Sequence, residues 1–417
     1  MNAMRNKAQL KRYNLDNSAL FYPIMASKKS QSLFRLSVVL CDEVDQEVFR
    51  QAVVKTMDRF PVFKTRLKMG YAWHYLGENT EDVKIFDKSK SILAPIDPKE
   101  TNGYLFRFVV EGKEIALEMF HGICDGTGAS VFFRGVLQKY RQLQGVGVGG
   151  DKAVDFGLEY TNEEDEDAYK RYYTPIKFKD ADLKSLTGVK PQLIKGTLDK
   201  NGYSATTYFG SYQEVGGLAK ERGVTFTAFL SGVMAYTLGK INYGDNPIVI
   251  MVPVNLRAMF PSKTMRNFTT FVRLTFLNDN CTDVEECIRE ASKQLKEKTD
   301  SSELKKMIGT TVRSEKTLIL KIAPLWFKMM IAKFLRLFLK SRQTFIISNL
   351  GRFNTPDELG VDKAVFNVNV SRNAKTNMGV LTVGDKVAIS FTKSIVEDEI
   401  ASVFSDTVLM LGGKLTK

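Results

Sequence analysis

The chain has 417 residues, enough for one large domain or two medium-sized domains, since a single hydrophobic core stops growing near roughly 250–300 residues. Hydrophobic residues make up 44% and charged residues 26%, a globular composition that excludes a disordered scaffold. The net charge of +13 favours anionic partners such as phosphates, a membrane surface or an acidic carrier protein, and the stretch from Arg289 to Arg342 contributes +9 of it. Because no nucleic-acid-binding motif accompanies this charge, we expect no nucleic-acid partner.

The cysteines, the histidines and the first residues narrow the compartment and the chemistry. Cys41, Cys124, Cys281 and Cys287 show no CxxC spacing and are too few for a disulfide framework, so we expect free thiols in a reducing cytoplasm. The chain has two histidines without paired ligands around them, so we expect no metal site. The basic opening MRNKAQLKRY is unlike a signal peptide, and no run of about 18 apolar residues predicts a spanning helix. We therefore expect a cytoplasmic protein, peripheral on the membrane at most.

The first half of the chain predicts strands and helices in alternation. Apolar and polar side chains alternate from Leu33 to Leu40, which predicts a strand, and apolar residues at helical spacing predict a helix from Asp45 to Phe60, ended by Pro61. The next predicted elements are strands at Val62–Lys68, Leu105–Val110 and Glu114–Phe120, and a helix from Thr127 to a glycine-rich stop at Gly145–Gly150. The acidic span Glu159–Tyr173 is interpreted as a linker or a solvated loop.

The second half repeats this alternation. Strands are predicted at Ile248–Val254, Thr270–Phe276, Thr344–Ser348, Val365–Val370, Gly379–Val383 and Val387–Thr392. Helices are predicted at Phe226–Ile241, Asp283–Glu297 and Glu397–Leu411. The pattern favours two α/β or α+β domains of similar build, residues 1–160 and 175–417.

The stretch Phe120-His121-Gly122-Ile123-Cys124-Asp125-Gly126 carries the strongest chemical pattern. It lies between a predicted strand and a predicted helix, where loops often hold catalytic groups. With an ordinary pKa of about 6.5, His121 is mostly neutral at cellular pH and can accept a proton. Asp125 fits a group that fixes the imidazole's surroundings, a ligand of a cation that shapes the turn, or a helix cap. Gly126 permits a positive φ or a close backbone approach. Spacing alone leaves a catalytic histidine and a structural one both open.

HGICDG resembles the HxxxDG active-site motif of chloramphenicol acetyltransferases, plant BAHD acyltransferases, wax ester synthases, peptide-synthetase condensation domains and alcohol acetyltransferases. Leu15-Asp16-Asn17 with Pro23 resembles the opening of bacterial alcohol-acetyltransferase-like proteins. The segment Val252–Arg257, with Arg266-Asn267-Phe268, and Ser348-Asn349-Leu350-Gly351 are similar to later segments of that family. These matches span nearly the whole chain. The DFGWG motif of the plant enzymes has no late counterpart, because Asp155-Phe156-Gly157 lies too early and is interpreted as a turn.

The resemblance implies a fold and an activity. It implies two chloramphenicol-acetyltransferase-like domains, each a mixed sheet with flanking helices, and an active-site tunnel at their interface. In the implied O-acyltransferase reaction, His121 is the general base that moves an acyl group from acyl-CoA, or from an acyl-phosphopantetheine carrier, to an acceptor alcohol or amine. It also implies no covalent intermediate and no permanently bound cofactor. Asp125 would be structural and pair with an arginine, for which Arg257 is the candidate, and Asn349 would stabilise the oxyanion, line the tunnel or form a turn.

Cys124, inside the motif, and His74, far upstream of it, are of residue types that can take part in catalysis. Cys124 invites a Cys–His nucleophile hypothesis, but the resemblance implies direct attack, and a cysteine beside a buried turn usually serves packing. His74 is interpreted as a structural or surface histidine.

The segment Leu318–Arg342 (LILKIAPLWFKMMIAKFLRLFLKSR) combines basic and apolar residues at helical spacing, with Pro324 in the first turn. Its cations Lys321, Lys328, Lys333, Arg336 and Lys340 are predicted to share one arc of the helix. Three interpretations stay open: an interfacial helix on an anionic membrane, a core helix whose lysines extend to solvent, and the border of an acyl or phosphopantetheine entrance, where a carrier protein could bind.

Three functions therefore compete. The first is an O-acyltransferase that uses acyl-CoA and an alcohol. The second is a free-standing condensation-type enzyme that takes acyl groups from a carrier protein and makes an ester or an amide. The third is a catalytically silent binding protein of the same fold, against which the intact His121, Asp125 and Gly126 argue.

Overall fold

The computed structural model describes residues 11–27, 31–87, 91–150, 153–176, 189–277, 282–316, 321–338, 342–371 and 374–417. Its strands are β1 (Arg12–Asn14), β2 (Leu33–Leu40), β3 (Thr65–Met69), β4 (His74–Glu78), β5 (Ile85–Phe86), β6 (Phe106–Glu111), β7 (Glu114–Phe120), β8 (Ser204–Ser211), β9 (Ile248–Asn255), β10 (Thr269–Phe276), β11 (Phe345–Arg352), β12 (Val361–Val368), β13 (Thr376–Val383) and β14 (Lys386–Lys393). Its α-helices are α1 (Phe21–Met25), α2 (Gln46–Arg59), α3 (Gly126–Leu143), α4 (Ala168–Arg171), α6 (Tyr212–Glu221), α7 (Phe226–Ile241), α8 (Val284–Lys298), α9 (Ser301–Lys316), α11 (Leu325–Phe338) and α12 (Glu399–Met410).

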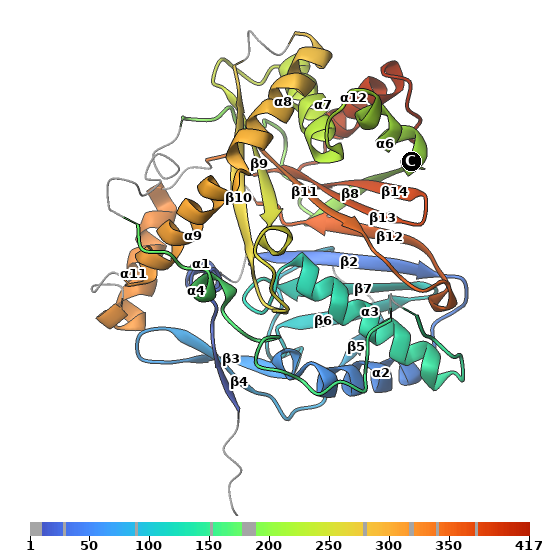
Figure 1. Ribbon diagram of the computed structural model, residues 1–417, viewed down its shortest axis with the longest axis vertical. Helices are drawn as coiled ribbons and strands as arrows, with labels where there is room; N and C mark the ends of the chain where they lie inside the picture. The colour runs from blue at the N-terminus through green and yellow to red at the C-terminus, as the bar shows by residue number, and fades with distance from the viewer. Residues whose placement is uncertain are drawn as a thin grey trace, which may run out of the picture.

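Two mixed sheets with flanking helices make up the fold, as the sequence predicted (Figure 1). The first has five strands in the order β12-β2-β7-β6-β5 and is covered by α2 and α3. The second has six strands in the order β10-β9-β11-β13-β14-β8, with α6, α7, α8 and α12 on its outer side. A separate three-stranded sheet, β1-β4-β3, extends below α11.

The helices on the two sheets follow from their sequences. In α2, the Asp45 side chain accepts hydrogen bonds from the first turn, and Phe49, Val53 and Met57 repeat at four-residue spacing and are buried. Helix α7 is apolar on most sides and is almost entirely buried. It lies so close to α8 that a Cβ on Gly232 would come within 2.4 Å of the Ile288 Cα. Helices α2 and α7 therefore stabilise the sheets mainly through burial of apolar surface.

The two large sheets meet where β12 crosses β13. Although β12 comes from the second half of the chain, it pairs antiparallel with β2, so Phe366 lies opposite Leu36. A Cβ on Gly379 of β13 would come within 2.0 Å of the Phe366 carbonyl oxygen, so a glycine is required for this contact. The Asn367 amide also donates to the Ser390 hydroxyl across the interface. Because β12 crosses over in this way, the division into residues 1–160 and 175–417 stays a prediction.

The acidic span Glu159–Tyr173 is not the solvated loop that its composition predicted. Ala168 and Tyr169 are buried in a small third core with Phe268 and Ile308, and the Tyr169 hydroxyl donates to a backbone carbonyl. The acidic residues serve this packing because they pair with cations; Glu164, for example, pairs with Arg59 at 2.9 Å. In this span, the acidic residues therefore indicate ion pairs at a packed interface rather than exposure of the segment to solvent.

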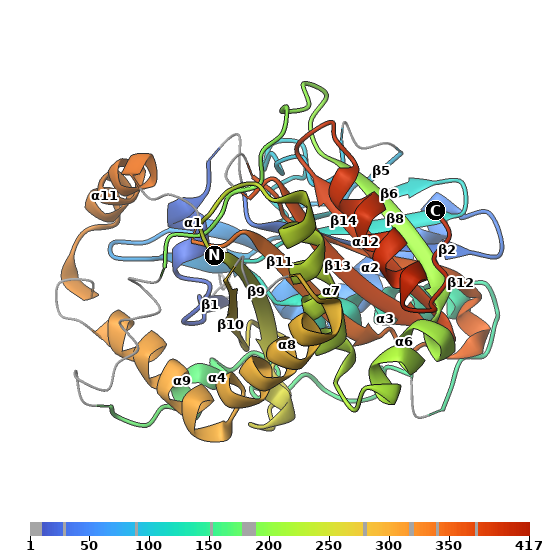
Figure 2. The ribbon, with the colours of Figure 1, turned by 90° about the horizontal axis from the view of Figure 1, so that it is seen from above.

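Helix α11 lies beside α1 at the edge of the molecule, whereas α9 packs near α4 (Figure 2). Among the described helices, none alone is long and apolar enough to span a membrane. The pair α6 and α7 passes that test of length and composition only when taken together, and the two are bent by 85°.

Most elements predicted from the sequence are present. β2, β7 and α7 have the predicted bounds, and the remaining predicted strands and helices differ by a few residues at their ends. Eight of the strands and α-helices named above had no counterpart in the predictions, namely β1, α1, β4, β5, α4, β8, α6 and α9. Of these, α1 matters most for the site described next, because it contributes a ring to the surroundings of His121.

Candidate active site

His121 is held through its backbone at the turn between β7 and α3. Its N–H donates to the Ser32 carbonyl at 2.9 Å, and its own carbonyl accepts from the Asn267 side-chain amide, also at 2.9 Å. Ser32 precedes β2, whereas Asn267 lies just before β10. Two segments far apart in the sequence therefore fix the position of this histidine.

The His121 imidazole lies among aromatic rings and is held in its neutral form. Tyr22 of α1 stacks on it with ring centroids 5.2 Å apart, and Phe34 of β2 packs at 4.6 Å. Burial lowers the pKa of His121 to about 4, although the Asp125 charge and a hydrogen bond with the Asn267 side chain act in the opposite direction. The residue keeps some accessible surface, because it lines a cavity. A neutral imidazole in such a place can accept a proton from a bound hydroxyl.

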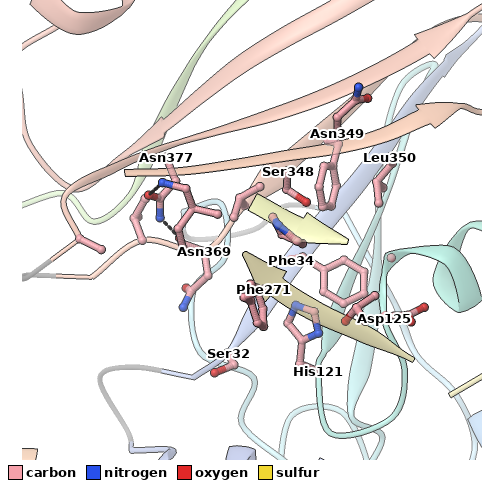
Figure 3. A pocket seen from close by; sticks show the side chains of 18 of the residues that line it. Ser32, Phe34, His121, Asp125, Phe271, Ser348, Asn349, Leu350, Asn369 and Asn377 are labelled. Carbon is pink, nitrogen blue, oxygen red and sulfur yellow. Dashed lines mark hydrogen bonds between the residues drawn. The ribbon is translucent and has the colours of Figure 1, made fainter. Parts of the chain in front are cut away.

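The cavity has a volume of about 280 Å³ and lies between the two large sheets, with His121 in its wall (Figure 3). Among the described residues that line it, Asp125 alone carries a formal charge; the others are apolar or neutral polar. Phe271, which is 39% exposed, lies where the wall reaches the surface. A mostly uncharged cavity that holds one imidazole suits neutral reacting groups such as an ester, a thioester or an alcohol.

Asp125 caps helix α3 and joins it to the second sheet. One carboxylate oxygen accepts from the Gly128 N–H at 3.0 Å, and the other accepts from the Phe268 N–H at 2.8 Å and from Arg257 at 2.7 Å. The Arg257 guanidinium also donates to the carbonyls of Thr264 and Arg266. The structure thus brings the two predicted partners, Asp125 and Arg257, together in an ion pair. This buried pair ties the loop of His121 to the segment that precedes β10.

The glycines of the motif permit close packing. Gly126 does not need a positive φ; a Cβ there would come within 2.5 Å of the Leu350 side chain, so the close-approach alternative applies. Gly128 is more restricted, because its Cβ would lie 1.9 Å from the Met265 carbonyl oxygen, a backbone atom that cannot yield easily. Sequence reasoning did not identify Gly128, although its place in the first helical turn after Asp125 is a usable clue.

Asp16 and Asn267 form a second clamp behind His121, also not identified as site residues from the sequence. The Asn267 amide that donates to the His121 carbonyl also donates to Asp16 at 3.0 Å, and Arg266 lies 3.6 Å from the same carboxylate. Asp16 further accepts from the Ala19 N–H at 2.8 Å. Burial raises the pKa of Asp16 despite the nearby Arg266. The segments around Asp16 and Asn267, both of which resemble segments of the acyltransferase family, thus meet at His121.

The Asn349 side chain has partners other than a substrate. Its amide donates to the Thr227 hydroxyl at 3.1 Å, and its oxygen accepts from the Gly351 N–H at 2.8 Å. Of the three roles named for Asn349, these contacts support the formation of a turn. Gly351 has a φ of 74°, which explains the glycine after this asparagine. The neighbouring Ser348 instead projects from β11 toward the cavity, across from His121 (Figure 3).

The remaining candidates are structural by their surroundings. Cys124 is fully buried, and burial raises the pKa of its thiol well above the usual value, which disfavours the thiolate that a nucleophile requires. His74 is a buried residue of β4, and burial lowers its pKa. Asp155 accepts from the Gly157 N–H at 2.7 Å and forms the predicted turn. Within the described ranges, no three His, Cys, Asp or Glu residues gather where they could hold a metal ion.

Comparisons with known proteins agree with this architecture. No family model and no curated protein matches the chain by sequence. Among solved structures, it is similar to the trichothecene 15-O-acetyltransferase TRI3 from Fusarium sporotrichioides (TM-score 0.65, 10% identity, 98% of this chain and 97% of that one). It is also similar to Fusarium graminearum TRI101 complexed with coenzyme A and T-2 mycotoxin (0.63, 11%, 97% and 99%). A third match is the epimerization domain from the third module of tyrocidine synthetase B (0.62, 12%, 99% and 98%).

These matches cover nearly the whole of each chain, so they concern the complete two-sheet architecture. The chain has the two-domain, chloramphenicol-acetyltransferase-like fold that these acetyltransferases share with the synthetase domain, as predicted. At this low identity the likeness establishes the fold, and the argument for an activity has to come from the site itself.

Proposed function

We propose that this protein is an acyltransferase that moves an acyl group from a thioester, preferably acyl-CoA, to an acceptor hydroxyl. The observation that carries the proposal is the position of the His121 imidazole in the wall of a mostly uncharged cavity between the two sheets, where burial lowers its pKa to about 4. The fold is compatible, because similarly folded proteins include a trichothecene 15-O-acetyltransferase and a protein complexed with coenzyme A and T-2 mycotoxin.

In the proposed reaction, His121 takes the proton of the acceptor hydroxyl while that oxygen attacks the thioester carbonyl. The resulting tetrahedral intermediate collapses, the carbon–sulfur bond breaks, and the imidazolium returns the proton to the leaving thiolate. The products are an ester and a free thiol, without an acyl-enzyme. General-base catalysis of this kind contributes about 10²–10⁴-fold, and alignment of the two substrates in one cavity contributes further.

The developing oxyanion needs a hydrogen-bond donor on the side of the cavity that faces His121. We assign this role to Ser348 in place of Asn349, because the Ser348 side chain projects toward the cavity, whereas the Asn349 amide already donates to Thr227. A Ser348→Ala variant should lose kcat, while Asn349→Ala should mainly lose stability. If Asn349→Ala loses kcat at unchanged stability and Ser348→Ala does not, this assignment is wrong.

A second depression offers a place for the phosphates of a coenzyme A donor. It has a volume of about 390 Å³, and its lining shares Thr127 with the cavity of His121. Of its cations, Arg59 and Arg257 pair with buried or half-buried carboxylates, whereas Arg134 donates to the Asn354 carbonyl, and Lys263 pairs only at the exposed surface. Arg134 and Lys263 are therefore the cations best placed to meet an anion there.

Free-thiol release from a panel of acyl-CoAs, with and without alcohols, tests the proposal. We expect alcohol-dependent release by the native protein and a loss of about 10²–10⁴-fold in His121→Ala, with little change in the free energy of unfolding. An Arg134→Ala variant should raise the KM for acyl-CoA but not for an S-acyl-N-acetylcysteamine, which lacks phosphates. Release only from carrier-bound acyl groups would favour a condensation-type enzyme, and no release from any thioester would favour a binding protein.

A further inference from the structure

Helix α11 presents large apolar side chains to solvent. Trp326, Met330 and Phe334 follow one another at four-residue spacing and are 64%, 54% and 61% exposed. Residues on the opposite side of the helix, Leu325 and Ala332, are buried. A helix on the surface of a globular protein normally turns its polar side outward, so this orientation is the reverse of the usual one.

The contacts of α11 with the rest of the protein fix this orientation. The Leu325 N–H donates to the Tyr71 carbonyl at 2.7 Å, and the Lys328 ammonium donates to the Ala72 carbonyl at 2.6 Å. The same ammonium lies 3.6 Å from the centre of the Trp73 ring. Lys328, one of the cations predicted to share an arc of the helix, is therefore buried, because its stem and charge bind this loop.

The structure also corrects the predicted extent of the Leu318–Arg342 helix. The helix is broken at Ala323–Pro324, and Lys321 precedes the break, so Lys321 does not share an arc with the cations of α11. The core-helix interpretation fails because the apolar face is exposed. Lys340 lies outside the described residues, as does the Arg336 side chain.

The apolar face of α11 continues onto neighbouring elements. Phe21 and Met25 of α1 and Met69 and Tyr71 of the β3–β4 hairpin are between 38% and 77% exposed, and Phe21 contacts Trp73 at 5.9 Å. We call Phe21, Met25, Met69, Tyr71, Trp326, Met330 and Phe334 the apolar ridge. In both overall views α11 lies at the periphery of the molecule, and the side chains of the ridge are exposed there (Figures 1 and 2).

The charge around the ridge indicates what binds it. From Lys316 to Arg342 the sequence has seven basic residues and no acidic one, and Lys321 and Lys333 are exposed. An exposed apolar face flanked by cations, with a tryptophan on it, is the pattern of a helix that enters the headgroup region of an anionic bilayer. A protein partner would need a matching groove for the same ridge.

We propose that the apolar ridge docks this protein on an anionic lipid surface and that one of its substrates is a lipophilic molecule carried by that membrane. The second part rests on the proposed acyltransferase function. It follows from α1, because Phe21 and Met25 of this short helix lie in the ridge while Tyr22, between them, stacks on His121 and lines the cavity. A single turn of helix thus separates the docked surface from the reacting groups.

Co-sedimentation of the full chain with vesicles tests the docking. With equal parts phosphatidylcholine and phosphatidylglycerol at low ionic strength, the native protein should sediment; with phosphatidylcholine alone it should stay in solution. The variant Trp326→Ser/Met330→Ser/Phe334→Ser should bind about tenfold more weakly or less. The matched control Leu409→Ser/Met410→Ser, in α12, changes side chains that are equally exposed (64% and 61%) and should bind like the native protein.

Two double lysine variants test how much the cations contribute to vesicle binding. Lys321→Glu/Lys333→Glu should weaken binding to the anionic vesicles, whereas Lys220→Glu/Lys414→Glu, exposed elsewhere on the molecule, should have a smaller effect. The docking proposal is overturned if the native protein stays in solution with anionic vesicles, or if the triple serine variant binds as well as the native protein. It is also overturned if the native protein self-associates through the ridge and does not bind vesicles.

The two proposals fail in different ways. The triple serine variant should keep the native rate of thiol release with a water-soluble alcohol and lose rate only with a long-chain alcohol embedded in vesicles. His121→Ala should bind vesicles normally. Vesicle binding without thiol release from any thioester would remove the acyltransferase and leave the docking surface, whereas equal rates of the triple variant on both alcohols would remove the membrane-borne substrate.

Discussion

Behind His121 the side chains are charged or amide-bearing and paired, whereas in front of it they are aromatic and line an open cavity. Asp125 bonds Arg257 and two backbone N–H groups, and Asn267 bridges Asp16 and the His121 carbonyl. On the other side, Tyr22 and Phe34 pack on the imidazole itself. The difference teaches that one side fixes where the histidine lies and the other side decides its protonation state.

Variants on the two sides of the His121 ring should differ in whether they mainly change stability or mainly change the pKa of the ring and the rate. Changes behind the histidine should lower the free energy of unfolding and displace the ring, because they leave buried polar groups without partners. Changes in front should act on the pKa of His121 and on the rate. They should lower stability as well where the side chain belongs to the core, as Phe34 does.

Arg257→Gln should have the largest effect on stability. It leaves the buried Asp125 carboxylate without its cation, which typically costs about 3–5 kcal/mol of unfolding free energy. Denaturant unfolding measures this loss. Lys263→Gln, in the same loop, removes an exposed pair with Glu163 and should cost less than about 1 kcal/mol. Equal losses in the two variants would mean that the Asp125–Arg257 pair does not anchor the loop.

Asn267→Ala should cost less stability but affect catalysis directly. Loss of its amide deprives the buried Asp16 and the His121 carbonyl of a donor, worth about 1–3 kcal/mol, and frees the ring to shift, so kcat should fall more than KM rises. Asn17→Ala is the matched control, because Asn17 is an equally buried amide that donates to Glu315 and does not contact His121. Should both variants keep the native kcat, Asn267 is structural and does not position the base.

The pH dependence tests the front of the ring. Because burial lowers the pKa of His121 to about 4, the ring stays neutral above that pH, and kcat/KM should fall only as the pH drops through about 4 rather than near 6.5. The folded state then binds fewer protons than the unfolded state between these values. The stability contribution is therefore complete above pH 6.5 and is lost as the pH falls toward 4. A midpoint near 6.5, measured after checking that activity returns at neutral pH, would contradict a desolvated ring.

The sequence predicted the elements of this site better than their contacts. The strand alternation in β2 and β7 and the apolar run of α7 gave their bounds, because period and length are local properties. Apart from the Asp125–Arg257 pair, which the family resemblance implied, contacts across long separations were not predicted. Asp16 and Asn267 are 251 residues apart, and β12 pairs with β2 from the far end of the chain. Helix α1 is too short for a period and contains Pro23, so no local pattern predicted it.

Helix α11 is another case in which the sequence predicted the element but not its contacts. The spacing of its residues predicted a helix with a basic arc, but spacing does not say what each face contacts. The arc interpretation failed at Lys328, because the Trp73 ring and the Ala72 carbonyl offered that lysine a better environment than water.

Cys124→Ser should have the smallest effect. The side chain is buried below Gly128, and burial raises the pKa of the thiol, so no thiolate is at hand to attack a thioester. Serine is nearly the same size, and its hydroxyl should cost stability without removing a reacting group, so kcat should stay within about twofold of the native value while His121→Ala loses activity. Steady-state thiol release by the two variants, side by side, is the measurement. An inactive Cys124→Ser protein of native stability beside an active His121→Ala protein would replace the general base by a covalent thioester route, because the acyl group would then have to rest on sulfur before it reaches the alcohol.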